Sequence, residues 1–500
     1  MKYKNIKKIK DCIRKNQGFD VIIIVSSNGN SKYWQERLSQ TRKEILPQKT
    51  KIISIEENWQ GRAGQLLGTL AAFENVSKEI DLRELLKNKG TIAIYHTAGY
   101  GKRMAPLCGT EGNNKPAVKL LKPIKIFGSN NLLNLLEATI LSTQIFAPSR
   151  EGQLCVFWSD QIIIPSRTPK KETKLPVEIF GIKKKFSLSP EEWKKNWQNY
   201  GILIPTTGPS VLQREKLKWE DIETLQKQGH LKIDSKGRTE MARSMGCFSI
   251  SLPFLEALLE EFSPELKSKK RELNTDPDLW MPLTSFKKEY LLKKENELYW
   301  QRIKKFKRKF EKKHRLKVLV GEKNLGQDTI WWDYGNLANY YKNFLKALEN
   351  SDEGAAVREF YEIDKYLIKK KKSKEFKIYN SIIINSEIEK GEIQNSIILN
   401  SKIKKIRSKR SIIINSNLRK AFAKNSLFYY LQEGKQVRSI PREVITDIAL
   451  GEGTKIRMRT TILRDGKKDW KVRLPRNIFS YSEIERCLSR LANHSFKIKL

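Results

Sequence analysis

The chain has few of the residues that build metal clusters or disulfide frameworks. Its 500 residues include only 4 histidines, which argues against a histidine-rich metal site. The 5 cysteines are far apart, and no pair has the spacing of a zinc or redox motif; they stand at Cys12, Cys108, Cys155, Cys247 and Cys487. We therefore expect no disulfide framework and a reducing, cytoplasmic setting.

Long apolar runs are also missing. The apolar stretches are short, such as residues 21–25, whereas a membrane-spanning helix needs about 20 apolar residues. We therefore expect no membrane span. The basic residues 1–10 precede no long apolar stretch, so we expect no secretory signal either. With 39% hydrophobic and 31% charged residues, the composition is that of a globular chain.

Acidic residues are scarce relative to basic ones. The chain has 97 Lys and Arg against 56 Asp and Glu, for a formal net charge of +41. One interpretation is nucleic-acid binding, because Lys and Arg neutralise phosphates. We favour compositional drift, of the kind an AT-rich genome produces, because the basic residues are spread along the whole chain and isoleucine and asparagine are abundant too. A positive surface would still attract anionic nucleotides and sugar phosphates.

The first two thirds of the chain alternate between strand and helix patterns. Short apolar or β-branched runs predict strands at residues 19–26, 51–55, 91–95 and 154–158. Helical patterns are found at residues 33–46, 66–73, 132–141 and 300–317, the last strongly basic and expected on the surface. Strands that alternate with helices predict a mainly parallel sheet.

An internal repeat follows. The pattern Asn-Ser-Ile-Ile-Ile-Asn-Ser recurs with small changes from residues 380, 395 and 410, and a degenerate copy starts at 425. Short apolar strands at a fixed period, separated by Asn-Ser turns, predict a β-solenoid in which isoleucines point inward and asparagines occupy left-handed corners. The interval between repeats is shorter than the coil of about 18 residues in hexapeptide helices, so the handedness of the solenoid stays open.

A glycine loop follows the strand at residues 91–95. It reads Ala-Gly-Tyr-Gly-Lys-Arg-Met-Ala-Pro-Leu over residues 98–107. Glycines let backbone N–H groups approach phosphates, and arginine adds a bidentate clamp. Two common phosphate motifs are excluded, because Met104 stands where the dinucleotide fingerprint needs its third glycine and Arg103 stands where a P-loop needs Ser or Thr.

The loop and the following Lys115-Pro116 resemble the signature of sugar-1-phosphate nucleotidyltransferases, Ala-x-Gly-x-Arg-(Leu/Met)-x-Pro-Leu followed by Lys-Pro. The resemblance implies that Arg103 and Lys115 hold the triphosphate and the leaving pyrophosphate. Lys102 replaces the usual threonine, and we expect it to add a further cation. The loop residues expected at the nucleotide are Ala98, Gly99 and Gly101. Residues 109–114 lengthen the gap before Lys115.

Two aspartates resemble the metal ligands of this family. Asp160 ends the strand at residues 154–158, as the Gly-Asp of the family does, with Ser159 in place of the glycine. Asp333 lies in Trp-Trp-Asp-Tyr-Gly, which resembles Trp-x-Asp-x-Gly. The resemblance implies that these two carboxylates bind Mg²⁺. Asp276 and Asp278 are rival ligands, which we rank below Asp333.

Three further segments resemble the sugar-phosphate side of the family site. Tyr-Gly at Gly201 resembles the turn that contacts the sugar, and Glu215-Lys216 resembles a pair in which Glu accepts sugar hydroxyls and Lys meets the phosphate. Residues 245–250, with Gly246, resemble the strand that lines the sugar pocket, without its asparagine. These landmarks follow the loop in the order that the family shows.

One family element stands in an unexpected place. The base-reading pattern Gln-x-x-x-Gly-Thr-Ala-x-Ala is missing after Lys115, and a similar segment with Gly68 and Thr69 precedes the loop at residues 65–72. We interpret this as a circular permutation of the nucleotide-binding half, with Gly68 and Thr69 near the base. Together with residues 59–64, the arrangement resembles fucose-1-phosphate guanylyltransferases and plastid-type UDP-glucose pyrophosphorylases.

The expected architecture is an α/β, mainly parallel-sheet nucleotidyltransferase domain of the GT-A-like type, circularly permuted, with a C-terminal β-solenoid. The expected domains are the catalytic domain at 1–350, the solenoid at 377–431 and an unassigned basic tail at 432–500. Within the catalytic domain, the base-reading, loop-and-metal and sugar-phosphate parts are expected at 18–80, 90–160 and 161–350.

The expected reaction joins a nucleoside triphosphate to a sugar 1-phosphate with Mg²⁺, and UTP with glucose 1-phosphate is the favoured pair. The alternatives are GTP with a fucose-type sugar phosphate, a nucleic-acid-binding protein and a non-catalytic relative. The oligomeric state stays open, and we expect the solenoid to pack on the catalytic domain.

Overall fold

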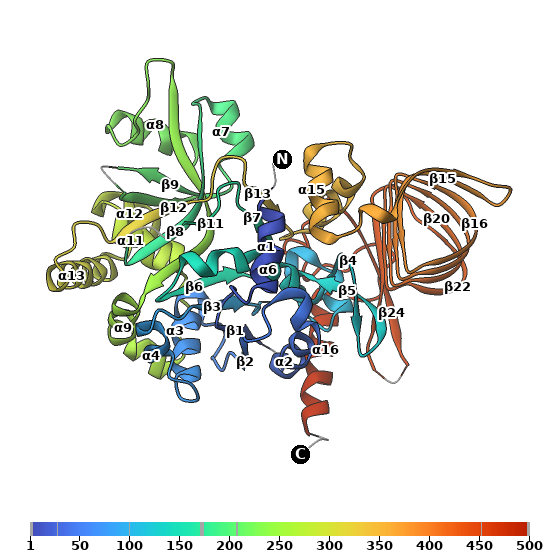
Figure 1. Ribbon diagram of the computed structural model, residues 1–500, viewed down its shortest axis with the longest axis horizontal. Helices are drawn as coiled ribbons and strands as arrows, with labels where there is room; N and C mark the ends of the chain where they lie inside the picture. The colour runs from blue at the N-terminus through green and yellow to red at the C-terminus, as the bar shows by residue number, and fades with distance from the viewer. Residues whose placement is uncertain are drawn as a thin grey trace.

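The computed structural model describes residues 4–27, 29–99, 101–170, 175–206, 209–451 and 453–497. An α/β body occupies one side of the molecule and a stack of β-coils the other, as expected for the α/β-plus-solenoid architecture (Figure 1). No helix among these described residues is both long and apolar enough to cross a membrane.

A nine-stranded sheet forms the centre of the α/β body. Four strands at one side are parallel in the order β2-β1-β3-β6, and the other side is mostly antiparallel around the long strand β11. The strands are β1 (Val21–Ser26), β2 (Lys51–Glu56), β3 (Ile92–His96), β6 (Gln153–Trp158), β8 (Val177–Ser187), β9 (Gly201–Pro205), β10 (Val211–Glu215), β11 (Arg238–Ser251) and β12 (Val320–Asn324). All four strands predicted from short apolar runs are confirmed in this sheet.

The strand order agrees with the permutation hypothesis. Doubly wound sheets have the order 3-2-1-4, counted from the strand that leads into the phosphate loop. With β3 in first place, β1 and β2 occupy the second and third places and β6 the fourth. In an unpermuted chain the second and third strands would follow the first, whereas here β1 and β2 precede β3.

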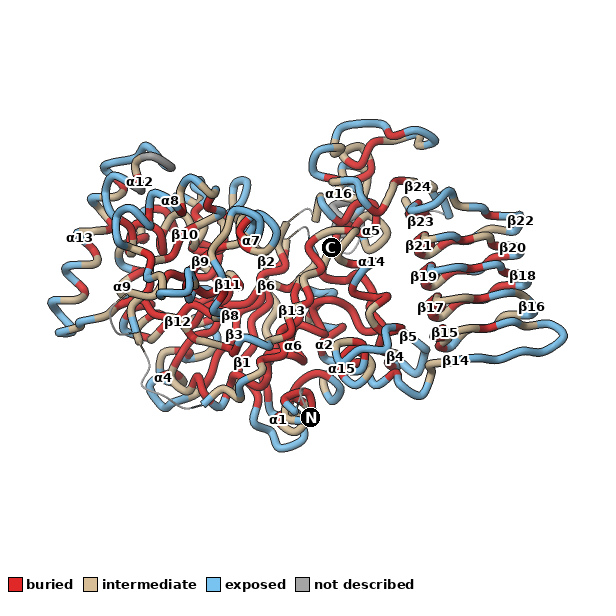
Figure 2. The backbone as a smooth tube through the Cα atoms, turned by 90° about the horizontal axis from the view of Figure 1, so that it is seen from above, coloured by how far each residue is buried: buried red, intermediate tan, exposed pale blue. Residues whose placement is uncertain are grey.

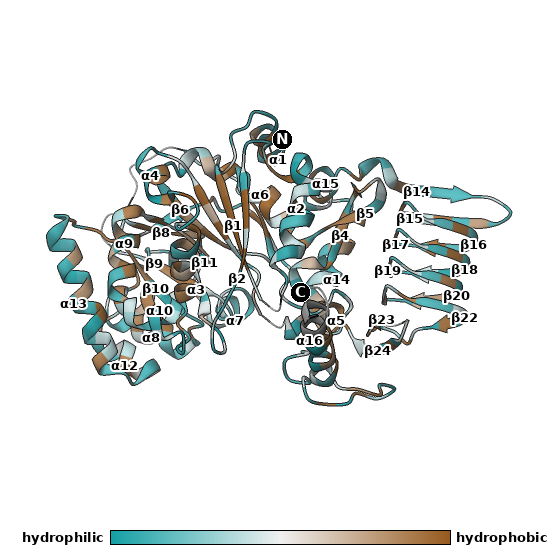
Figure 3. Ribbon diagram, turned by 90° about the horizontal axis from the view of Figure 1, so that it is seen from below, coloured by the Kyte–Doolittle hydropathy of each residue, from teal (hydrophilic) through white to brown (hydrophobic). Residues whose placement is uncertain are grey.

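Helices cover both faces of the parallel strands, which explains their uninterrupted apolar sequences. On one face Ile22, Ile24 and Tyr95 pack against α1 (Asn5–Arg14), α2 (Ser31–Ile45) and α6 (Leu135–Thr143). On the other face Val21, Ile23 and Ile94 belong to one apolar cluster with residues of the helices α3 (Gly64–Val76), α4 (Leu82–Lys87), α9 (Leu252–Glu261) and α13 (Glu297–Lys313). Figure 3 shows these helices on the two sides of the sheet.

One predicted helix begins later than expected. Residues 132–134 belong to β5 (Ser129–Asn134), which forms a hairpin with β4 (Lys119–Ile126). The side chain of Asn134 accepts a hydrogen bond from the backbone of Glu137 at 2.9 Å, and Glu137 accepts one from the backbone of Asn134, also at 2.9 Å. This capping box fixes the helix start at Leu135, so the prediction of a helix from residue 132 was wrong at its N-terminal end.

Shorter elements connect the sheet to the rest of the body. β7 (Gln161–Ile164) pairs with β13 (Ile330–Asp333) outside the main sheet. The remaining α-helices before the coils are α5 (Leu107–Thr110), α7 (Pro190–Asn196), α8 (Trp219–Lys227), α10 (Ser263–Ser268), α11 (Met281–Thr284), α12 (Lys287–Lys294), α14 (Leu337–Leu345) and α15 (Asp352–Tyr361).

The repeat forms a parallel stack of coils, as predicted. Ile382, Ile397, Ile412 and Leu427 are successive partners in neighbouring strands, so each coil advances by the repeat length. The corner positions have positive φ, for example 47° at Asn385, Asn395 and Asn400. Inside, Ser396 and Ser411 donate their backbone N–H groups to the hydroxyls of Ser381 and Ser396, each at 3.1 Å. Figure 2 shows the buried inner corners of the stacked coils.

The solenoid continues beyond the predicted repeats. Its strands are β14 (Leu367–Lys372), β15 (Phe376–Ile384), β16 (Glu387–Gln394), β17 (Ile397–Leu399), β18 (Lys402–Lys409), β19 (Ile412–Ile414), β20 (Asn417–Lys424), β21 (Leu427–Tyr429), β22 (Gln432–Arg438), β23 (Glu443–Ala449) and β24 (Lys455–Thr461). The segment 432–461, unassigned from sequence, thus adds strands to the stack. The described chain ends in helix α16 (Tyr481–Lys497), which passes close to α5 in Figures 2 and 3.

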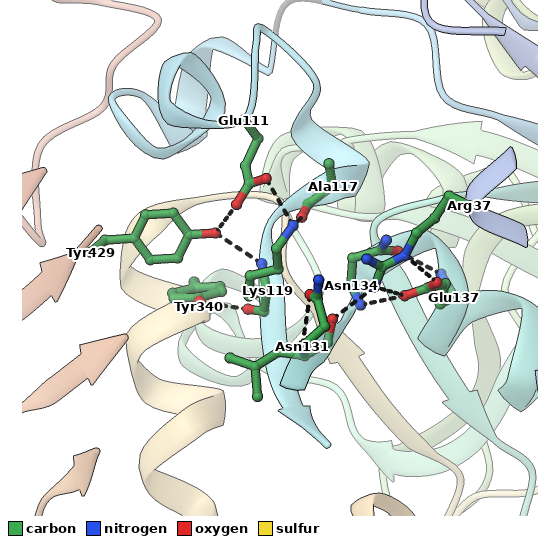
Figure 4. Close-up of polar contacts among 10 residues, drawn as sticks. Arg37, Glu111, Ala117, Lys119, Asn131, Asn134, Glu137, Tyr340 and Tyr429 are labelled. Atoms are coloured by element: carbon green, nitrogen blue, oxygen red, sulfur yellow. Dashed lines mark hydrogen bonds and ion pairs between the residues drawn. The ribbon is translucent and has the colours of Figure 1, made fainter. Parts of the chain in front are cut away.

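A buried polar cluster joins the solenoid to the α/β body (Figure 4). The Tyr429 hydroxyl donates to Glu111, and the Lys119 backbone N–H donates to the same hydroxyl at 3.0 Å. The Lys119 ammonium pairs with Glu111 at 2.9 Å. Burial alone would lower the pKa of Lys119, but the Glu111 charge outweighs it and raises the pKa. Glu111 belongs to the lengthened segment 109–114, which therefore serves as a docking surface for the solenoid.

Candidate functional site

A cleft of about 560 Å³ lies where the parallel strands β3 and β6 end. It contains the predicted loop, metal and sugar-phosphate residues. Those that line it are Ala98, Gly99, Gly101, Lys102, Arg103, Lys115, Asp160, Gly201, Glu215, Lys216, Gly246 and Asp333. They come from distant parts of the sequence, and the carboxyl ends of parallel strands are where open α/β sheets bind ligands.

The glycine loop is held in a conformation that requires its glycines. Gly99 has φ of 129° and Gly101 has φ of 57°. A Cβ atom on Gly101 would lie 2.6 Å from the Cys108 sulfur and 2.7 Å from Lys115 Cβ, so no side chain fits. Arg103 lies in the short 3₁₀ turn that follows. Its guanidinium is close to Gly335, because a Cβ atom on Gly335 would lie 3.3 Å from a guanidinium nitrogen of Arg103. Tyr100 lies outside the described residues.

Strand pairing brings the two predicted metal aspartates together. In the β7–β13 pair Asp333 is opposite Gln161, and the Tyr334 backbone N–H donates to the Asp160 carbonyl at 2.9 Å. The carboxylate of Asp333 accepts hydrogen bonds from the Gly335 backbone at 2.6 Å and the Asn339 amide at 3.0 Å. The carboxylates are thus oriented by different groups but face the same cleft.

The electrostatics of the two carboxylates differ. Burial would raise the pKa of Asp160, but its ion pair with Lys115 and the nearby Arg103 outweigh this and lower it. The pKa of Asp333 is raised, first by burial and then by the charge of Asp160. The opposite directions of the two shifts thus follow from the neighbours of each carboxylate: cations beside Asp160, and the Asp160 charge beside Asp333.

The donor set fits Mg²⁺ with a phosphate substrate. Among the described residues no group of three or more His, Cys, Asp and Glu is placed to hold a metal ion. Mg²⁺ is commonly held by one or two carboxylates, with water and substrate phosphates completing the octahedron. Asp160 and Asp333 would supply those carboxylates, and residues of the glycine loop line the same cleft.

The sugar-phosphate candidates line the same cleft. Gly201 pairs with Glu215 across β9 and β10, and a Cβ on Gly201 would lie 2.4 Å from the Glu215 carboxylate. Lys216 has a left-handed backbone with φ of 49°, which begins the turn after β10. Gly246 has φ of 67°, and a Cβ there would lie 2.6 Å from the indole nitrogen of Trp158. A side chain at either glycine would therefore collide with a neighbouring residue of the cleft.

The rival aspartates are separated by the structure. Asp278 does not line the cleft; it accepts from the Asn274 backbone at 2.7 Å and pairs with Lys294 at 3.2 Å. Asp276 does line the cleft, but on the sugar-phosphate wall, where the Gln213 amide lies between it and Glu215. Asp276 thus belongs with Glu215 rather than with Asp160.

We expect Asp276 to make stability depend on pH. Burial, followed by the neighbouring Glu215, raises the pKa of Asp276, and Lys216 offsets only part of this. The folded protein then holds a proton that the unfolded chain releases above its ordinary pKa of about 4, so the free energy of unfolding falls as pH rises.

Asp276→Asn removes the titrating carboxyl group. Relative to the wild type, the free energy of unfolding of the variant should therefore rise by up to about 1.4 kcal/mol per pH unit between about pH 5 and 7. Urea unfolding at several pH values measures the difference, and a difference independent of pH would contradict the assignment.

A smaller pocket of about 160 Å³ opens beside the cleft and shares Arg62, His96, Ala98, Gly99 and Trp158 with it. Its further lining includes Glu57, Gly61, Gly64 and Gln65. The predicted base residues Gly68 and Thr69 lie inside α3 and are not among the lining residues. They back the wall instead: the Thr69 hydroxyl hydrogen-bonds His96 at 2.9 Å, and a Cβ on Gly68 would meet Glu57 and His96 at 3.2 Å.

Several lining residues were not singled out from the sequence. Gly61, Arg62 and Gly64 stand in the segment 59–64 that leads into α3, which was recognised from the sequence without these three residues being singled out. Glu57 and His96 carry no motif of their own. Burial lowers the pKa of His96 to about 4, so its ring is neutral near pH 7 and can exchange hydrogen bonds without carrying charge.

Comparisons with known proteins give little beyond this. A scan of protein families finds no match, and no curated protein matches the chain either. Among solved structures, the chain is similar to a putative glucose-1-phosphate thymidylyltransferase from Bacillus anthracis, with 11% identity and a TM-score of 0.20. That match covers 68% of this chain and 98% of the other. The likeness is distant.

Proposed function

We propose that the chain is a sugar-1-phosphate nucleotidyltransferase, which joins a nucleoside triphosphate to a sugar 1-phosphate and releases pyrophosphate. The observation that carries the proposal is the composition of one cleft, which is lined by the loop cations, a carboxylate pair and a Glu-Lys pair. In-line transfer to phosphorus needs no covalent partner from the protein, only positioned charges. The cleft offers charges suited to both substrates.

The residues divide between the two substrates. Arg103 and Lys102 would bind the β- and γ-phosphates and stabilise the leaving pyrophosphate. Lys115 would exchange Asp160 for phosphate oxygens when a nucleotide enters. Asp160 and Asp333 would hold Mg²⁺, which when bound neutralises the phosphates at the reacting centre.

For the sugar phosphate, Lys216 would align the phosphate oxygen that attacks the α-phosphorus, and Glu215 would accept hydrogen bonds from sugar hydroxyls. The smaller pocket beside the glycine loop would take the base. Its lining by Gly61, Arg62 and Gln65 supports the permutation hypothesis, since these residues belong to the family-like segment that precedes the loop. Our favoured substrates are UTP and glucose 1-phosphate, with GTP and a fucose-type sugar phosphate as the alternative.

The test is pyrophosphate release in the presence of Mg²⁺, with the four common nucleoside triphosphates crossed against glucose, mannose, fucose and N-acetylglucosamine 1-phosphates. We expect release with one nucleotide and one sugar phosphate, and none when either substrate is omitted. Binding of each nucleotide is measured in parallel by calorimetry. A folded protein that neither binds a nucleoside triphosphate nor releases pyrophosphate would contradict the proposed function.

A further inference from the structure

The chain after the solenoid returns to the phosphate loop. The Thr110 and Thr446 hydroxyls hydrogen-bond at 2.6 Å, and the Asn113 amide donates to the Glu485 carbonyl at 3.0 Å. Ala105, directly after the 3₁₀ turn of the loop, packs in one apolar cluster with Ile448 and Leu474. The closeness of α16 to α5 is visible in Figures 2 and 3. The C-terminal part therefore packs against the segment that carries the loop cations.

The link between β24 and α16 is fixed against the loop at two points. Gly466 is so close to the loop that a Cβ there would lie 2.2 Å from the Lys102 carbonyl oxygen and 3.2 Å from Ala105 Cβ. Four residues later, the Trp470 ring lies under the Lys102 ammonium, 5.0 Å from the ring centroid. The backbone of this link is thus positioned by contacts on either side of Lys467.

Lys467 lines the cleft together with Lys102 and Arg103. The acidic residues nearest to it in sequence do not pair with its ammonium: Asp465 accepts from the Lys467 backbone N–H at 2.9 Å, and Asp469 pairs with Arg464 at 3.2 Å. In the part of the chain that the structure describes, Lys467 forms no ion pair. Its ammonium is therefore available to an anion in the cleft.

We propose that Lys467 binds the phosphates of the nucleotide, so the link after the solenoid forms part of the substrate site. This inference rests on the proposed function. Lys102 and Arg103 lie on the same side of the cleft, where the outer phosphates and the leaving pyrophosphate would bind. Lys467 supplies a further cation there, from a segment more than 350 residues further along the chain. The solenoid then has a role beyond packing, because it positions the link that carries this lysine.

The experiment compares Lys467→Ala and Lys467→Glu with Lys468→Ala and Lys468→Glu in the full-length protein. Lys468 is exposed, adjacent and outside the cleft lining, so it matches Lys467 in local charge. Nucleotide affinity with Mg²⁺ and inhibition by added pyrophosphate are both measured. We expect Lys467→Ala to weaken both about tenfold, as for the loss of one charge-assisted hydrogen bond. Lys467→Glu should weaken them more, while both Lys468 variants stay within about twofold of wild type.

The outcomes separate this inference from the function on which it rests. If the wild type binds nucleotide and the Lys467 variants behave like the Lys468 variants, the inference is wrong and the proposed function stands. If the wild type binds no nucleoside triphosphate at all, both fail together. Equal losses at Lys467 and Lys468 would indicate a general effect of surface charge and would also overturn the inference.

Discussion

Replacing Asp160 by asparagine is expected to lower kcat by about a thousandfold or more while the protein stays folded. The substitution keeps the size of the side chain but removes the charge that would hold Mg²⁺ beside the α-phosphate. A catalytic metal stabilises the transition state by several kcal/mol, and each 1.4 kcal/mol is a factor of about ten in rate. Steady-state pyrophosphate release, with Mg²⁺ varied, measures the loss.

Asp278→Asn is the matched control. Asp278 was a rival metal ligand from the sequence, but it lies outside the cleft lining and pairs with Lys294. The same chemical change there should leave kcat within about twofold of wild type, since asparagine keeps an oxygen that can accept from Asn274. If Asp160→Asn keeps more than a tenth of the wild-type kcat, or if both variants lose activity equally, Asp160 is not the metal ligand.

Replacing Glu137 by alanine is expected to lower the free energy of unfolding by about 3–5 kcal/mol, because it leaves the buried Arg37 charge without its carboxylate partner. The guanidinium donates to both carboxylate oxygens, at 2.7 and 2.9 Å, and the two residues are 7% and 0% exposed. Arg37 lies on α2 and Glu137 on α6, so the pair joins the segment before the phosphate loop to the segment after it (Figure 4).

Urea unfolding tests this prediction with two comparisons. The double change Arg37→Met and Glu137→Leu should recover most of the loss, because it removes both charges and keeps apolar volume. Glu260→Ala breaks a surface pair in which the side chains are 77% and 74% exposed, and it should cost at most about 1 kcal/mol. A Glu137→Ala loss no larger than the Glu260→Ala loss would contradict the assignment.

The features that the sequence predicted well depend on local patterns or on repeated spacing. Strands such as β1 and β3 are continuous apolar runs, because helices cover both of their faces, and the runs are visible without knowledge of the helices. The solenoid was predictable because each coil repeats the same corners and the same inward isoleucines. The cleft residues were found one motif at a time, and the sheet then placed their strand ends together.

What the sequence did not predict depends on contacts between distant segments. The start of α6 was predicted too early because apolar residues such as Leu132 and Leu133 fit a buried strand as well as a buried helix. Only the cap at Asn134 distinguishes the two structures. The docking of the solenoid on residues 109–114 depends on the hydrogen bond from the Tyr429 hydroxyl to Glu111. These two residues are 318 positions apart in the sequence, so no local pattern indicates the contact. Lys467 stands in a segment without any periodicity, and its relation to Lys102 follows only from the packing of Gly466 and Trp470.

The return of the chain to the phosphate loop has a consequence for synthesis on the ribosome. Strands β1, β2 and β3 leave the exit tunnel early, and the loop follows them at once. The contacts that cover the loop are made much later, since Asn113 and Glu485 are 372 residues apart. Contacts between such distant residues form slowly, and the uncovered surface is open to wrong partners in the meantime. During translation the nascent protein would therefore expose Ala105 and the apolar side of α5 until β23, the link after β24 and α16 have been synthesised and have packed against them.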